Sequence, residues 1–83
     1  LFNTFVYPNP SKDAFHIGFS LYKDQEYTVQ VMDISGRIVF ESGKMKGDKG
    51  ANDFSWDALV NSGIYIYSVR SEGFQSSGRL VKQ

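Results

Sequence analysis

Turn-forming residues recur at short intervals along this sequence, and they limit the length of any single element. Six clusters of them divide the chain: Pro8-Asn9-Pro10, Lys23-Asp24, Ser35-Gly36, Gly47-Asp48-Lys49-Gly50, Asn61-Ser62-Gly63 and Glu72-Gly73. The runs between these clusters are short and rich in β-branched and aromatic residues, which favour a pleated sheet. No run carries the i, i+3, i+4, i+7 apolar spacing of an amphipathic helix. The pattern therefore predicts an all-β protein.

The short runs alternate between apolar and polar residues with the period of two that is typical of strands with one buried face. The clearest is the run in which Phe15, Ile17, Phe19 and Leu21 alternate with polar or small residues. We expect strands over residues 5–7, 15–22, 27–32, 37–41, 54–56, 64–70 and 75–82. About seven short antiparallel strands predict an immunoglobulin-like β-sandwich with Greek-key connections, formed by residues 1–83 as a single domain.

Composition narrows the classes of function. A chain of 83 residues buries a marginal core, but aromatic residues make up 16% of it and bury a large area each. The absence of cysteine excludes disulfides and thiolate metal sites. Nine basic residues balance nine acidic ones and are scattered, which argues against binding to nucleic acid. The locally basic stretch 44–49 is interpreted as a solvated loop.

No apolar run approaches the roughly 20 residues that span a bilayer. The chain begins at Leu1 without an initiator methionine or a signal peptide. We therefore expect it to be a fragment of a larger secreted protein, whose other domains lie upstream.

The residues that most often carry chemistry form no convergent set in the sequence. His16 is the single histidine, it lies on the polar side of its strand, and Asp13 is the nearest acidic residue along the chain. No nucleophile-elbow motif surrounds Ser76 or Ser77. We expect no catalytic activity and no cofactor. Calcium binding by Asp48, Asn52 and Asp53 is a further hypothesis, although ordinary turn chemistry explains these residues equally well.

Glycan binding is the alternative from another class of function, because small β-sandwiches of secreted hydrolases often bind sugars through exposed aromatic rings. The rings available are those of Tyr7, Tyr22, Trp56, Tyr65 and Tyr67. Trp56 and Phe54 are expected in the core, and the strand over residues 64–70 is expected to be buried on both faces. Tyr22 is then the best candidate for an exposed ring.

Four blocks of sequence follow one another in an order that is more specific than any one of them. They are Tyr7-Pro8-Asn9-Pro10, then Asp33-Ile34-Ser35-Gly36-Arg37, then Gly63-Ile64-Tyr65, and finally Gly78-Arg79-Leu80-Val81-Lys82-Gln83. In this order the chain resembles, over residues 5–83, the type A C-terminal sorting domain of the type IX secretion system. It is more distantly similar to the immunoglobulin-like domain of flagellar hook-capping proteins, which implies the same fold.

The resemblance implies a non-catalytic export signal. It implies passage of an upstream cargo domain through the periplasm and then across the outer membrane of a Gram-negative bacterium, to the cell surface or the extracellular space. The implied partners are the type IX translocon and a sortase-like protease, which removes the domain and attaches the cargo to lipopolysaccharide. We expect the domain itself to be a monomer. A purely structural immunoglobulin-like domain remains a further alternative.

The signature residues have structural interpretations as well. Two prolines fix φ and end the pairing of residues 5–7, and Asp33, Gly36 and Arg37 suit a tight hairpin in which Gly36 takes a positive φ. The residues interpreted in this way are Pro8, Asn9, Pro10, Asp33, Gly36, Arg37, Gly63 and Tyr65.

The terminal strand is the candidate for recognition by the translocon or the sortase-like protease. An edge strand offers unpaired backbone groups to a partner, and Arg79 and Lys82 add positive charge. The candidate residues are Gly78, Arg79, Leu80, Val81, Lys82 and Gln83. The alternative is that this strand completes the sandwich and that its lysine protects the sheet edge.

Overall fold

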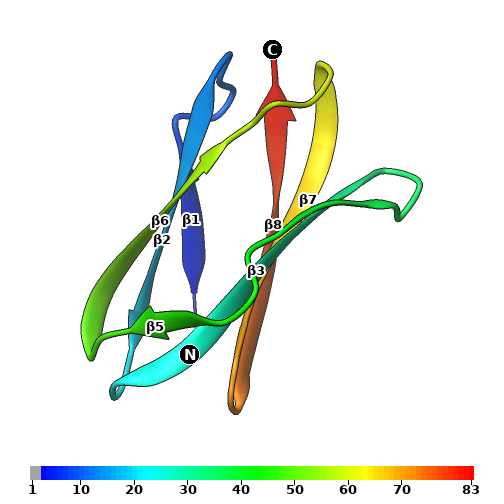
Figure 1. Ribbon diagram of the computed structural model, residues 1–83. Helices are drawn as coiled ribbons and strands as arrows, with labels where there is room; N and C mark the ends of the chain where they lie inside the picture. Colours follow the sequence, from blue (N-terminus) through cyan, green and yellow to red (C-terminus); the bar gives the residue numbers. More distant parts are fainter. Residues whose placement is uncertain (1–2) are drawn as a thin grey trace.

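A computed structural model describes residues 3–83, and within that range the chain forms eight β-strands (Figure 1). The strands are β1 (Thr4–Tyr7), β2 (Ala14–Leu21), β3 (Gln25–Asp33), β4 (Ile38–Glu41), β5 (Met45–Gly47), β6 (Gly50–Asp57), β7 (Gly63–Ser71) and β8 (Phe74–Lys82). The described residues contain no helix long and apolar enough to cross a membrane.

The strands form two antiparallel sheets. The smaller sheet has the order β1-β2-β6, and the larger has the order β4-β3-β7-β8, with β5 also paired to β3. β4 pairs with Gln30–Met32 and β5 with Gln25–Tyr27, so both follow one edge of β3. The chain crosses between the sheets after β2, after β5 and after β6. These crossings make an immunoglobulin-like β-sandwich, and the predicted fold class is confirmed.

Two expectations about strand positions are wrong. The basic stretch 44–49, expected as a loop, contains β5. There Gly47 packs so closely that a Cβ atom would lie 2.5 Å from Cδ1 of Leu21, and this lets the short strand approach the core. β6 starts at Gly50 and not at Phe54, because its polar first half pairs with the backbone of β2 from Gly18 to Leu21.

The core lies between the two sheets and is strongly aromatic. Phe40 of β4 approaches Phe54 and Trp56 of β6, with ring centroids 6.0 Å and 5.6 Å apart, and these contacts join the sheets. The core positions of Phe54 and Trp56 are as predicted. The buried apolar side chains are those of Phe15, Ile17, Phe19, Leu21, Tyr27, Val29, Val31, Phe54, Trp56, Ala58, Tyr65, Tyr67, Val69 and Leu80.

The expectation that residues 64–70 are buried on both faces is wrong. Tyr65, Tyr67 and Val69 face the core, but Ile64 on the other face is 43% exposed. The reason is that the structure places no further layer of described residues on the outer face of the larger sheet.

Candidate recognition surface at the C-terminal strand

β8 is the edge strand of the larger sheet, and β7 is its neighbour within that sheet. Its side chains alternate between the core and the solvent. Leu80 is fully buried at 0% exposure, whereas Arg79 is exposed on the outer face. Gly78 faces the core beneath Tyr67, where a Cβ atom would lie 2.6 Å from the tyrosine oxygen. Gly78 and Leu80 therefore serve the packing of the sandwich.

The segment that follows β1 covers the outer edge of β8. The side chain of Asn9 donates through Nδ2 to the carbonyl of Arg79 at 3.1 Å, and its Oδ1 accepts the backbone N–H of Val81 at 2.9 Å. The N–H of Ser11 donates to the carbonyl of Val81 at 3.1 Å, and the N–H of Gln83 donates to the carbonyl of Ser11 at 2.8 Å. We call residues 8–11 the clasp. Because of the clasp, these backbone groups of the edge strand are not free to pair with a partner.

The two basic side chains of the terminal strand differ in their surroundings. The ammonium Nζ of Lys82 donates to the carbonyl of Val60, at 3.2 Å, in the segment between β6 and β7. The guanidinium of Arg79 has no hydrogen-bond or ion-pair partner among residues 3–83. Outside the β-ladder, the one hydrogen bond of this residue is accepted by its backbone carbonyl. Arg79 therefore offers the more accessible positive charge.

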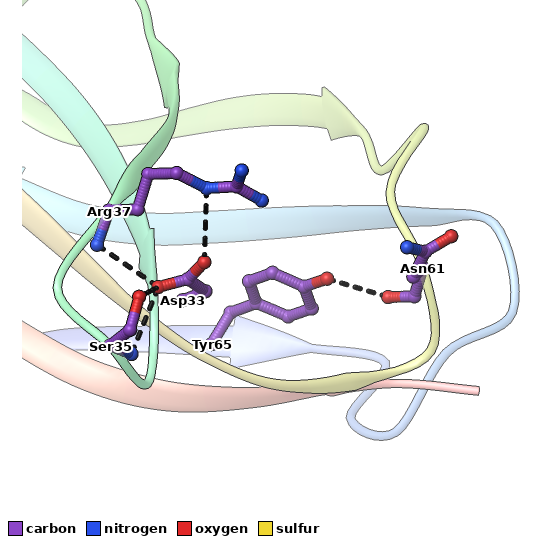
Figure 2. A network of polar contacts seen from close by, with 5 residues as sticks. All are labelled: Asp33, Ser35, Arg37, Asn61 and Tyr65. Atoms are coloured by element: carbon purple, nitrogen blue, oxygen red, sulfur yellow. Dashed lines mark hydrogen bonds and ion pairs between the residues drawn. The ribbon is translucent and has the colours of Figure 1, made fainter.

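The hairpin between β3 and β4 is built around the carboxylate of Asp33 (Figure 2). Its Oδ1 accepts the backbone N–H groups of Ser35 and Arg37, both at 3.0 Å, and the hydroxyl of Ser35 at 2.6 Å. Its Oδ2 pairs with Nε of Arg37 at 3.3 Å. The hydroxyl of Ser35, followed by the backbone N–H groups, holds the pKa of Asp33 below its ordinary value. Gly36 has φ of +91°, as the sequence predicted.

A tyrosine corner lies beside this hairpin. The hydroxyl of Tyr65 donates to the carbonyl of Asn61 at 2.7 Å and fixes the link that enters β7. Asp33 and Tyr65 are direct partners in the β3–β7 register, and Figure 2 shows them next to each other. At the same end of the sheet Gly63 pairs with Lys82. The four sequence blocks thus lie at the same end of the larger sheet.

Comparison with known families identifies a family to which the chain belongs. Residues 5–83 match the family described as the secretion system C-terminal sorting domain. The chain belongs to this family. The resemblance to the type IX sorting domains is thereby confirmed, and the match identifies the chain as a C-terminal secretion sorting domain. No curated protein matches the chain.

The sorting domain carries a polar cluster on the outer face of its smaller sheet that the sequence did not predict. Nδ1 of His16 lies 3.0 Å from Oδ2 of Asp53 and 3.0 Å from the hydroxyl of Ser55. The hydroxyl of Tyr7 donates to Oδ1 of Asp53 at 2.8 Å, and this hydrogen bond is the main reason why the pKa of Tyr7 is raised. His16 meets Asp53, and not its sequence neighbour Asp13, because of the β2–β6 register.

This cluster contains the residue types of a serine-hydrolase triad but not its arrangement. A proton relay needs the carboxylate on one ring nitrogen of histidine and the hydroxyl on the other. Here Asp53 and Ser55 both approach Nδ1 of His16. The geometry suits a polar brace across β1, β2 and β6.

The residues suggested for calcium binding do not converge as one set of oxygen ligands. The side chain of Asn52 bonds to the backbone of Asp48 and Gly50 within the turn. Asp53 turns away to meet Tyr7 and His16. Across residues 3–83 no three His, Asp or Glu side chains are grouped to hold a metal ion.

Proposed function

We propose that this domain directs an upstream cargo domain of the same protein across the outer membrane through the type IX secretion system. The match to the sorting-domain family over residues 5–83 carries this proposal. The cargo would pass through the periplasm and end at the cell surface or in the medium. The domain takes part as a folded signal without catalytic work, as a monomer and without nucleic acid, and the partners are the translocon and a sortase-like protease that transfers the cargo to lipopolysaccharide.

The terminal residues contribute to recognition in different ways under this proposal. Leu80 is buried, Gly78 makes room for Tyr67, and Lys82 bonds to the β6–β7 link, so these three support the folded shape. Arg79 and Val81 direct their side chains to the outer face, opposite Ile66 and Ile64. We assign the contact with the machinery to these outward side chains.

An export assay tests the proposed function. The domain is fused behind a periplasmic reporter with an ordinary signal peptide and expressed in a strain that has the type IX translocon. We expect the reporter on the cell surface or in the medium of this strain, and in the periplasm of an isogenic strain without the translocon. Equal retention of the reporter in both strains would refute the proposal.

The alternative of glycan binding gains little from the arrangement of the rings. Tyr22, the best candidate, is 66% exposed but packs against Phe74 with a ring angle of 45°. Tyr7 stacks with Phe5 and with His16, at centroid distances of 5.8 Å and 5.2 Å. Neighbouring rings therefore take up ring faces that a sugar would need.

A further inference from the structure

The outer face of the larger sheet is apolar at one end. Met32 of β3 lies opposite Ile38 of β4 on one side and opposite Ile66 of β7 on the other. Ile64 of β7 lies opposite Val81 of β8. Residues that are direct partners project from the same face of a sheet, so these five side chains form one surface, which we call the apolar patch. Ile38 and Ile64 are 53% and 43% exposed.

The remainder of this face is polar. The next row of partners along the sheet contains Gln30, Ser68 and Ser77, and the row after it contains Thr28, Arg70 and Gln75. The outward residues of these strands change from apolar to polar between one row of partners and the next. The apolar patch is therefore confined to one end of the face.

Arg79 is at the margin of the apolar patch. It is the direct partner of Ile66 on β8, so its side chain projects from the same face. Its guanidinium has no partner among the described residues. An arginine beside exposed apolar side chains is typical of protein interfaces, and a guanidinium binds carboxylates with paired hydrogen bonds. The chemistry fits a partner surface that is apolar and places a carboxylate opposite Arg79.

The core and the clasp leave the outer face as the accessible surface of residues 78–83. The inner side chains of β8 are in the core, and backbone groups of Arg79, Val81 and Gln83 at its outer edge bond to Asn9 and Ser11. Its outward side chains remain accessible. We propose that the apolar patch with Arg79 docks onto a protein of the secretion machinery whose contact surface is apolar and acidic. This inference rests on the proposed sorting function.

Two variants test the surface in the same reporter fusion. Ile64→Glu places a negative charge in the apolar patch, and Arg79→Glu reverses the charge at its margin. We expect each to lower export about tenfold, the effect of losing about 1.4 kcal/mol of binding free energy. Two controls are matched to them. Arg70→Glu reverses a charge on the polar half of the same face, and Leu59→Glu changes an apolar side chain that is 93% exposed outside the sheet. We expect export of both within about twofold of the parent.

Three measurements separate the outcomes. Thermal unfolding of each purified domain should give a midpoint close to that of the parent, so that lost export reports on recognition. If the parent is exported and Ile64→Glu and Arg79→Glu are exported equally well, the docking surface is wrong and the sorting function stands. If the parent itself is not exported, the sorting function fails. Sedimentation velocity must show a monomer. A dimer that Ile64→Glu dissociates would mean that the patch binds a second copy, which overturns the proposal.

Discussion

At the scale of single residues, Asn9 joins the beginning of the domain to its end. Its side chain accepts from Val81 and donates to Arg79, partners that lie 72 and 70 positions away. An asparagine carries both an acceptor and a donor, so one side chain bonds both backbone groups. Neither the flanking prolines nor the turn they form would predict these bonds from the sequence, since the bonds depend on where β8 passes.

Substituting Asn9→Ala tests this role directly. We expect the substitution to lower the free energy of unfolding by about 1 kcal/mol, because two partly solvated hydrogen bonds are lost. Amide exchange of Val81, followed by NMR, should become several-fold faster. Asn61→Ala is the matched control, since the backbone carbonyl of Asn61 accepts from Tyr65 while its side chain points away in Figure 2. Unchanged exchange at Val81 in Asn9→Ala would contradict the assignment.

At the scale of elements, the β3–β4 hairpin depends on a charged group. The bonds from Ser35 and Arg37 favour the ionised form of Asp33, and the folded-state pKa is lowered from 3.8. The stabilisation is therefore fully present above the ordinary pKa of a carboxyl group, and it disappears as the pH falls through the folded-state value.

The variant Asp33→Asn keeps the shape of this side chain and removes its charge. At neutral pH we expect it to unfold at a lower urea concentration than the parent. The difference should shrink when both proteins are measured at a pH below the folded-state pKa of Asp33, where the aspartate becomes protonated. Glu72→Gln is the control, because the carboxylate of Glu72 has no bond among residues 3–83. A difference of equal size at both pH values would show that the charge is not responsible.

The elements that the sequence predicts well are those in which apolar core residues alternate with polar or small residues. β2 was predicted from Phe15, Ile17, Phe19 and Leu21, all of which are buried. β5 and the first half of β6 were missed because backbone pairing places them, and few apolar side chains mark them. The polar cluster was missed for a related reason. His16 and Asp53 are 37 positions apart, and only the register of β2 with β6 brings them together.

At the scale of the whole molecule, β8 closes the sandwich. A chain of hydroxyls runs from Tyr67 of β7 to Thr4 of β1 and on to Ser76 of β8, with both distances at 3.0 Å. The row of hydroxyls, the clasp and the buried Leu80 all depend on β8. The hydroxyls join β1 of the smaller sheet to the larger sheet, and the clasp joins the segment after β1 to the same sheet. The terminal strand is thus part of the structural frame as well as the candidate signal.

Removal of residues 78–83 should therefore unfold the domain. Loss of a buried leucine costs about 2–5 kcal/mol when its side chain is truncated, and a domain has roughly 5–15 kcal/mol of stability in total. The deletion also removes the partners of the clasp and half of a strand.

We expect the truncated domain to show no cooperative thermal transition by circular dichroism and no dispersed amide spectrum. A truncated domain that unfolds cooperatively would show that the second half of β8 is dispensable for the fold, and lost export in that variant would then report on recognition alone. If it unfolds as expected, a truncation that abolishes export cannot separate the signal from the fold. Substitutions of the outward side chains, such as Arg79→Glu, make that separation because they leave Leu80 and the clasp in place.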